Sequence, residues 1–370
     1  PPLRSSAASD VYKRQRRARV IIWDEAPMAP REALECADRL LRDFMETPDL
    51  PFGGKAVVLG GDFRQVLPVM PHASRDDILS HSVKNSPLWK NAAVRVFSLA
   101  KNMRAAKDTA WQEYLLNLGD GGVDHVPAIS PYAVRVPDHI CAPRSWGVAD
   151  LTKWVYPEMM PTIDGLLRTP QQADLDYFSK RAVLAPKNVD VDSINEAMLQ
   201  TFPETEHTTY FSSNSVEGTD SDHLWPVDFL NAQTPNGMPP HKLTVARGAV
   251  VMLLRNLDTT MGLCNGVRLL VVHALPRVLD CMIISGSEHV RGRRVYIPRI
   301  TLAPKLPDLP FVLRRRQFPV KLAWAMTINK AQGQSLARVG VFLPTPVFSH
   351  GQLYVAYSRA GNSEHIKVLV

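Results

Sequence analysis

The sequence predicts an α/β fold that consists of two α/β units. Short, unbroken apolar runs alternate with helical patterns, first at residues 20–59 and again from residue 182 onward. Polar residues follow several of these runs directly, as at the carboxyl ends of strands in open α/β sheets. A chain of 370 residues also exceeds the usual size of a single hydrophobic core. We therefore expect at least two domains.

The first apolar run carries the strongest chemical signal. Val20–Trp23 is typical of a strand that is buried on both faces, and Asp24 and Glu25 follow it at once. A nucleotide-hydrolysing site requires such a pair. One carboxylate holds Mg²⁺ through its water shell, and the other orients or deprotonates the attacking water. A polar strand end followed by a turn at Pro27 is the competing interpretation.

A helix and a second strand are expected next. The helix begins near Pro30, and a second buried strand, Val57–Leu59, is followed by Gly60, Gly61 and Gln65. If the two strands are neighbours, Gln65 emerges beside the carboxylates, where a Gln senses the γ-phosphate or positions water. A Gly-Gly turn with a solvated Gln is the alternative. The apolar face of the helix consists of Ala33, Leu34, Ala37, Leu40, Leu41 and Phe44.

The pattern then weakens toward a predicted linker. A third strand is expected within residues 89–99, and Arg104 lies shortly after it, where an arginine is usually a surface charge. Residues 111–118 predict a short helix. Residues 126–180 are rich in Pro and Asp, which favours a linker between domains.

The second unit repeats the alternation of strands and helices around a segment of short strands. A long polar loop is expected at 207–240, and short strands with Pro breaks up to about residue 316 indicate a small β module. The other expected elements are strands at 182–184, 248–254, 267–272, 322–326, 339–343 and 366–370, and helices at 192–200 and 351–359.

Composition limits the classes of protein that remain. The chain is 45% hydrophobic and 21% charged, which is ordinary for a globular protein, and no run approaches the ~20 apolar residues of a membrane span. The four cysteines form no CxxC pair, which favours neither a disulfide framework nor a zinc site and suits a reducing compartment. Residues 1–19 carry six Lys/Arg against one Asp without apolar periodicity, and we interpret them as a non-native or disordered leader.

A local excess of positive charge is the better electrostatic signal. Nine Lys/Arg stand against the single Asp308 between Arg291 and Lys321. The adjacent residues Arg314, Arg315 and Arg316 precede the strand that leads into Thr327–Ser335. We expect them to contact DNA phosphates, although a solvated charged face is the usual fate of such a run.

The order of these motifs resembles the petite-integration-frequency (PIF) type of superfamily-one DNA helicase, in the branch that Helitron transposons encode. The similarity runs from about residue 20 to the end of the chain. The segments that carry it are Trp23–Met28, Pro51–Lys55, Gly60–Pro68, Asn102–Arg104, Ala185–Asn188, Met252–Leu257, Leu263–Gly266, Thr327–Ser335 and Phe348–Arg359.

The resemblance implies two RecA-like P-loop NTPase domains that bind ATP between them. The first, partial domain would be 20–125 and the second 181–255 with 317–370. A small SH3-like β module at 256–316 would be inserted in the second domain. The implied activity is ATP-dependent 5′→3′ translocation on single-stranded DNA with unwinding of duplexes. The implied partners are single-stranded and forked DNA, with ATP and Mg²⁺ as cofactors.

Site residues are carried over position by position from the resemblance. Asp24 would hold Mg²⁺, Glu25 would activate water, and Gln65 would couple to the γ-phosphate. Arg104 and Arg359 would be arginine fingers. Gln332 and Gly333 would bind the nucleotide and transmit its hydrolysis state, and Thr327 and Lys330 would contact DNA.

One departure from the family pattern affects the expected activity. These helicases carry a Gly-x-x-x-x-Gly-Lys-Thr phosphate loop, which this sequence lacks, since Gly53-Gly54-Lys55 has neither the upstream Gly nor the following Ser/Thr. We therefore expect an amino-terminally truncated helicase that binds ATP poorly. Tyr357 replaces the usual Leu of the family, a mild change.

Two other classes of function remain open at this stage. One is a non-catalytic remnant that binds single-stranded DNA, and the other is a phosphohydrolase that uses Asp24 and Glu25 with another metal geometry. The sequence has no His/Asp ligand cluster for the latter. The resemblance further implies a monomer without membrane contact, in the nucleus or alternatively the mitochondrion, that acts in DNA repair, recombination, telomere maintenance or Helitron transposition.

Overall fold

The computed structural model describes residues 13–70, 73–91, 94–99, 102–129, 133–158, 170–217, 225–304 and 309–370, and the backbone of 162–163 and 166–167. It divides into two compact units. Unit 1 consists of Pro1–Val134 with Val347–Ser358, and unit 2 consists of Arg135–Pro346 with Arg359–Val370. No helix of the described residues is long and apolar enough to cross a membrane.

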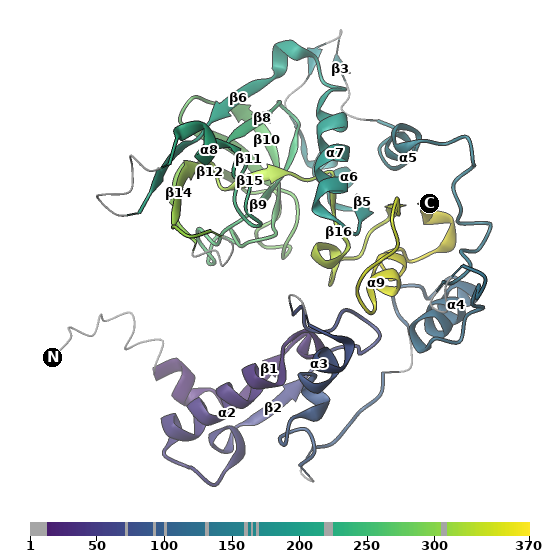
Figure 1. Ribbon diagram of the computed structural model, residues 1–370, viewed down its shortest axis with the longest axis vertical. Coiled ribbons are helices and arrows are strands. Elements are labelled where there is room, and N and C mark those ends of the chain that lie inside the picture. Colours follow the sequence, from purple (N-terminus) through teal and green to yellow (C-terminus); the bar gives the residue numbers. More distant parts are fainter. Residues whose placement is uncertain are drawn as a thin grey trace, which may run out of the picture. The chain divides into compact units, whose positions relative to one another are not determined.

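Unit 1 is built around a pair of parallel strands, which are drawn in purple and blue in Figure 1. Trp23 of the first strand lies opposite Leu59 of the second. The elements of unit 1 are β1 (Val20–Trp23), α2 (Arg31–Met45), β2 (Ala56–Leu59), α3 (Arg75–Ser80), α4 (Thr109–Asp120) and α9 (Gln352–Ser358), with short 3-10 turns at Ala26–Met28, Pro51–Gly54 and Val83–Asn85.

The strands of unit 1 are less covered than their sequences predict. Ile22 is 76% exposed, and Val20 and Val58 are each 53% exposed, because successive side chains of both strands alternate between a half-buried and an exposed face. The predicted burial on both faces is therefore wrong. The third strand expected within 89–99 is also absent from the described residues there, and Phe97 is 83% exposed.

The amino-terminal leader is only partly described. Residues 13–17 are helical, although we left residues 1–19 out of the fold, and residues 1–12 lie outside the described part of the chain. Lys55 Nζ donates hydrogen bonds to the backbone carbonyls of Arg16, at 3.0 Å, and Ala18, at 2.7 Å. Residues 16–18 thus contact the segment just before β2.

Unit 2 contains a parallel four-stranded sheet in the order β16-β5-β17-β18. Val183 and Leu184 of its central strand are fully buried. Helix α7 packs on β5 and β16, as Figure 1 shows, and α5 packs on β17 and β5. The elements are α5 (Val148–Val155), α6 (Gln172–Ser179), β5 (Arg181–Ala185), α7 (Asn188–Leu199), β16 (Ala325–Thr327), β17 (Arg338–Phe342) and β18 (Ile366–Leu369), with short 3-10 turns at Ile328–Ala331 and Ser363–His365.

The predicted linker at 126–180 is wrong from residue 135 onward. Ile140, Leu151 and Phe178 are buried in the core of unit 2, and Val368 of β18 exchanges backbone hydrogen bonds with residues 140 and 142. The Pro and Asp residues around them are typical of a linker, but the segment packs as part of the core. Part of this segment, within 159–169, lies outside the described side chains.

Antiparallel strands form the β module of unit 2. Its main sheet has the order β12-β11-β10-β9-β15, beside a three-stranded sheet β13-β14-β7 and the pair β6-β8. The elements are β6 (Thr208–Phe211), β7 (Ser213–Val216), α8 (Val227–Ala232), β8 (Lys242–Val245), β9 (Val250–Leu253), β10 (Arg268–Ala274), β11 (Val278–Ile283), β12 (Arg294–Pro298), β13 (Ile300–Leu302), β14 (Leu313–Gln317) and β15 (Val320–Leu322), with a 3-10 turn at Glu204–Glu206 and a short hairpin of β3 (Thr162–Ile163) and β4 (Leu166–Leu167) before α6.

The module is therefore larger than the predicted 256–316. The expected loop at 207–240 contributes β6, β7 and α8, and β9 and β15 join the module rather than the parallel sheet. A second difference concerns the helix expected at 351–359. It forms as α9, but its residues belong to unit 1 rather than to the second domain.

Candidate nucleotide and DNA sites

The carboxyl ends of β1 and β2 lie side by side and are tied together by their backbones. Gly60 N donates to Trp23 O at 2.9 Å, and Ala26 N donates to Gly60 O at 2.8 Å. A Cβ on Gly61, whose φ is 153°, would lie 2.2 Å from Pro27 Cδ, so only glycine allows this approach. The predicted neighbourhood of the two strand ends is thereby confirmed.

The two carboxylates occupy this junction with an unusual backbone. Asp24 is exposed and its Oδ1 accepts a hydrogen bond of 2.9 Å from Glu25 N. Glu25 has φ 51° and ψ 37°, in the left-handed region that few non-glycine residues adopt. Such a conformation costs on the order of 1–3 kcal/mol and is found preferentially at functional sites. The left-handed conformation of Glu25 changes the direction of the chain immediately after β1.

The residues at this junction can be compared with what a magnesium ion requires. The described residues hold no group of three or more His, Cys, Asp or Glu that could bind a metal ion by themselves. Magnesium, however, is usually bound through one or two carboxylates, several waters and substrate phosphates. The exposed carboxylate of Asp24 fits that role, whereas a cage made only of protein ligands does not exist in the described part of the chain.

The backbone of Gln65 packs against Gly351, in the segment that leads into α9. A Cβ on Gly351, whose φ is 73°, would lie 2.4 Å from both the backbone C and O of Gln65. Tyr354 of α9 donates its hydroxyl to Asp62 Oδ2 at 2.9 Å. Gln65 Oε1 is buried and accepts no hydrogen bond from a described residue, which is the kind of orphaned group that a ligand or water satisfies.

The two predicted arginine fingers lie in different units. Arg104 in unit 1 is placed by Asn102, whose Oδ1 accepts from Arg104 N at 3.0 Å, and its Nη1 donates to Ser358 O at 3.1 Å. Arg359 in unit 2 is 1% exposed, and its Nη1 donates to Gln334 O at 2.9 Å. Their action on one nucleotide stays a prediction.

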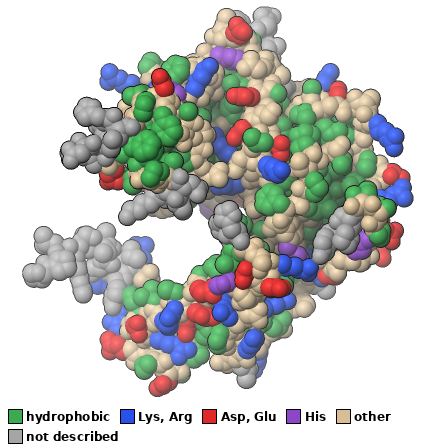
Figure 2. All heavy atoms as spheres, in the orientation of Figure 1, with side chains coloured by type: hydrophobic (Ala, Val, Ile, Leu, Met, Phe, Trp, Pro, Cys, Tyr) green, Lys and Arg blue, Asp and Glu red, His purple; other side chains and the backbone are tan. Residues whose placement is uncertain are grey.

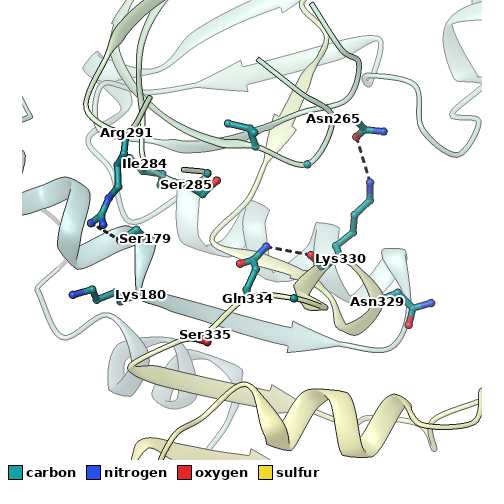
Figure 3. A pocket seen from close by; sticks show the side chains of 14 residues that line it. Ser179, Lys180, Asn265, Ile284, Ser285, Arg291, Asn329, Lys330, Gln334 and Ser335 are labelled. Carbon is teal, nitrogen blue, oxygen red and sulfur yellow. Dashed lines mark hydrogen bonds between the residues drawn. The ribbon is translucent and has the colours of Figure 1, made fainter. Parts of the chain in front are cut away.

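Several residues of the motif Thr327–Ser335 line a cavity of about 660 Å³ in unit 2, as Figure 3 shows. Lys330 Nζ donates to Asn265 Oδ1 at 3.4 Å, and Gln334 Nε2 donates to Lys330 O at 3.2 Å. Burial lowers the pKa of Lys330, and the neighbouring charges of Lys321 and Arg255 lower it further. We call this cavity the motif pocket.

The sequence predicted only part of the motif pocket. Lys330 and Gly333 line it, whereas Thr327 ends β16 and, like Gln332, is not among the lining residues. Eight polar lining residues were not predicted as site residues, although Asn265-Gly266 was noted as a motif. These eight are Ser179, Lys180, Asn265, Ser285, Arg291, Asn329, Gln334 and Ser335.

The three adjacent arginines of β14 do not act together. Arg314 and Arg316 are exposed, but Arg315 is fully buried. Its guanidinium donates to Asn214 Oδ1 at 2.8 Å and to the carbonyls of Pro239 and Leu230, both at 3.0 Å. The prediction that Arg315 contacts DNA is therefore wrong, because strand alternation turns it into the module.

Positive charge is not concentrated on unit 1 in the face that Figure 2 draws. Lys/Arg and Asp/Glu side chains are interspersed there. Ion pairs such as Arg64 with Asp120, at 2.7 Å, and Arg42 with Asp38, at 2.8 Å, neutralise part of this charge. This face of unit 1 therefore shows no surface of concentrated positive charge.

Known proteins resemble both units. The family model of PIF1-like helicases matches residues 4–126, and the model of the 2B domain of DNA helicase Pif1 matches residues 228–273. The ATP-dependent DNA helicase PIF1 of Xenopus laevis is 36% identical over 186 residues, which cover 49% of this chain and 26% of that protein. The Danio rerio protein of the same name is 28% identical over 355 residues, which cover 94% of this chain and 46% of that protein.

Solved structures resemble the whole chain. A crystal structure of Pif1 helicase from Bacteroides, in complex with ADP-AlF3 and ssDNA, aligns with 100% of this chain and 73% of that one, at a TM-score of 0.66 and 22% identity. This likeness concerns the fold, and it confirms the α/β class with RecA-like domains. The chain spans less than half the length of the two curated relatives. The family models and the curated relatives thus show that this chain is similar to PIF1-like helicases over separate parts of its length.

Proposed function

We propose that this chain is part of an ATP-dependent DNA helicase that couples ATP hydrolysis to 5′→3′ movement along single-stranded DNA and to unwinding of forked duplexes. One observation carries the proposal. Asp24 and Glu25 lie at the carboxyl end of a parallel strand, beside the loop that leads to Gln65, within residues that match the family model. This is the edge at which α/β sheets bind nucleotides.

The proposed roles follow from position and chemistry. Magnesium bound with ATP would supply charge neutralisation between the phosphate oxygens. Asp24 would hold that ion through water, and Glu25 would accept the proton of the attacking water. Gln65, whose Oε1 has no described partner, would orient the water or sense the γ-phosphate. Arg104 and Arg359 would neutralise the charge that develops during phosphoryl transfer.

The motif pocket is the proposed site for single-stranded DNA. Its polar lining comes from Thr327–Ser335, from Ser179 and Lys180 before β5, and from residues 265–291 of the β module, so one ligand would contact both parts of unit 2. Lys330 supplies positive charge, Arg291 supplies a guanidinium that is ion-paired with Asp176, and amide side chains supply neutral donors and acceptors. The related Bacteroides structure was solved with ADP-AlF3 and ssDNA, which supports both ligands for this chain.

We further propose that the isolated chain hydrolyses ATP negligibly. Its sequence contains no Gly-x-x-x-x-Gly-Lys-Ser/Thr segment to cradle phosphates, and the exposed face of β1 and β2 is consistent with a nucleotide site that is incomplete in this chain. From the resemblance we also propose that the chain belongs to the Helitron branch, is a monomer and lies in the nucleus, with the mitochondrion as alternative. A role in repair, recombination, telomere maintenance or transposition is likewise proposed from the resemblance.

A second candidate function is a non-catalytic module that binds single-stranded DNA. The contrast between the units favours it, because unit 2 has a buried parallel sheet and a polar pocket, whereas the strand pair of unit 1 is open on one face. The two candidate functions predict different rates of ATP hydrolysis, but both predict binding of single-stranded DNA.

The test measures both properties on the whole chain. DNA-stimulated ATP hydrolysis is followed alongside anisotropy of a labelled oligonucleotide, for the chain and for Glu25→Gln. We expect negligible hydrolysis and measurable binding that the variant leaves unchanged. Robust hydrolysis that Glu25→Gln abolishes would contradict the proposed inactivity and support a working helicase site. Absence of DNA binding at low salt would contradict both candidate functions.

A further inference from the structure

A second cavity in unit 2 is surrounded by arginines and lies on the β module. It has a volume of about 350 Å³ and is lined by Ser213, Arg277, Pro298, Arg299 and Arg316. Arg277 belongs to the turn between β10 and β11, Arg299 follows β12, and Arg316 lies on β14. Three segments distant in the sequence therefore bring one guanidinium each to the same space. We call this cavity the arginine pocket.

The described lining of the arginine pocket carries no negative charge. Among the described residues, no Asp or Glu lines it and no carboxylate forms an ion pair with any of its three arginines. Other arginines of unit 2 are paired, as Arg294 is with Asp280 and Arg247 with Glu206. Three like charges gathered without a counter-ion repel one another, and a bound anion would relieve that repulsion.

One of the three arginines is fixed in advance. Arg299 Nη1 donates to Phe211 O at 2.7 Å, and its guanidinium lies over the rings of Phe318, at 5.0 Å, and Tyr210, at 5.4 Å. Stacking on aromatic rings and a backbone hydrogen bond restrict its rotamers, so little side-chain entropy is lost when it binds. Its remaining N–H groups are available to an anion at the pocket.

The arginine pocket is separate from the motif pocket. Val267 and Ile284, at the base of the β10–β11 hairpin, line the motif pocket, whereas Arg277, at its tip, lines the arginine pocket. Seven residues of β10 separate the two ends, which corresponds to about 20 Å at the usual rise of a strand. One small ligand therefore cannot occupy both pockets.

We propose that the arginine pocket binds phosphate groups of a nucleic-acid strand, as a second contact beyond the motif pocket. The inference rests on the proposed function, since it assumes that unit 2 binds DNA. The described lining residues offer guanidinium and hydroxyl groups and no aromatic ring on which a base could stack. The contact is therefore to the backbone and independent of base sequence. A stacked strand rises about 3.4 Å per phosphate, so at most roughly six nucleotides of a strand separate the two pockets.

The test uses the length of the strand to separate the pockets. Anisotropy titrations with labelled oligothymidylates of about 3 and about 20 nucleotides, the shorter of which cannot reach from one pocket to the other, are run at several salt concentrations. The test variant is Arg277→Gln with Arg316→Gln. The matched control is Arg135→Gln with Lys153→Gln, which removes two exposed charges of unit 2 that line neither pocket. Lys330→Gln reports on the motif pocket.

The expected result is specific to the long strand. The test variant weakens binding of the longer oligonucleotide on the order of tenfold and lowers the salt slope by about 1.4, for two phosphate contacts. Binding of the short oligonucleotide changes no more than in the control. Inorganic phosphate at matched ionic strength does not displace the long strand, because it offers a single group where the strand offers many.

Each other outcome has a separate meaning. If the test variant and the control behave alike on the long strand while Lys330→Gln weakens binding, the arginine pocket is not a DNA contact and the proposed function stands. If the unaltered chain binds neither oligonucleotide, the proposed function and this inference both fail. If inorganic phosphate competes fully, the pocket is a site for the free anion, and the inference is overturned.

Discussion

The parallel strands of the two units have similar sequences and different surroundings. Val20–Trp23 in β1 and Arg181–Ala185 in β5 both carry apolar runs that predict a buried strand. In β5, Val183 and Leu184 are fully buried between flanking strands and the helices α5 and α7, whereas Ile22 in β1 is 76% exposed. An apolar run thus predicts a strand, but the elements that pack over it decide its burial.

The comparison also separates the chemistry of the two units. Unit 1 carries charged and strained residues at a strand end, with Glu25 in the left-handed region. Unit 2 carries the polar motif pocket and the arginine pocket on a well-covered scaffold. Precise placement of functional side chains is best achieved on rigid elements. We therefore expect DNA binding to depend on unit 2 even if unit 1 cannot complete a nucleotide site.

The largest expected effect tests the difference in burial directly. Leu184→Ala removes a fully buried side chain from the centre of the sheet and should lower the free energy of unfolding by about 2–5 kcal/mol. Ile22→Ala, in the exposed strand, should cost less than about 1 kcal/mol. Urea unfolding, followed by fluorescence of the buried Trp324 for unit 2 and by circular dichroism, measures both. Equal costs would show that β1 is as well covered as β5.

The next effect concerns neighbours on a single strand of unit 2. Arg315→Ala leaves Asn214 Oδ1 and the carbonyls of Pro239 and Leu230 without their donor, at an expected cost of about 2–3 kcal/mol. Arg314→Ala, exposed on the same strand, should change stability by less than about 0.5 kcal/mol. Urea midpoints of the two variants give the comparison. A stable Arg315→Ala protein with weakened DNA binding would restore the role first predicted for Arg315.

A smaller effect tests how tightly the candidate nucleotide site is packed in unit 1. Gly351→Ala places a Cβ against the backbone of Gln65 and should cost about 1–3 kcal/mol more than Gly121→Ala. Gly121 is a matched control because it has a similar φ of 76° and no atom within 4 Å of an added Cβ. Thermal unfolding followed by circular dichroism measures the difference. Identical melting of the two variants would mean that α9 does not pack closely on Gln65.

The smallest effect is a pH dependence confined to unit 1. His81 Nδ1 lies 2.7 Å from Glu32 Oε1, and this hydrogen bond lowers the pKa of Glu32 to about 2 from its ordinary 4.5. Because the folded-state pKa is depressed, the stabilisation is complete above pH 4.5 and is lost as the pH falls toward 2. As the pH is lowered from 4.5 to 2, the melting temperature of Glu32→Gln should therefore fall less than that of the unaltered chain. Parallel curves would exclude a role for the pair.

The sequence by itself determined the alternation of strands and helices and the residues that end them. Helices near 31–45, 109–120, 188–199 and 352–358 were predicted to within a few residues, because their apolar spacing and flanking Pro or Gly act locally. The placement of Asp24 and Glu25 after a strand, beside the loop to Gln65, was also local information. It required only that two consecutive strands be parallel neighbours.

Only the tertiary structure decided which faces are covered and which distant segments meet. Alternation along β14 was implicit in the sequence, but Arg315 faces inward because Asn214, Leu230 and Pro239 lie there. The assignment of α9 to unit 1 and of residues 135–158 to unit 2 likewise depends on long-range packing. The arginine pocket is assembled from three separate segments, none of which is a motif alone. Burial and convergence are properties of contacts between elements, which no local pattern encodes.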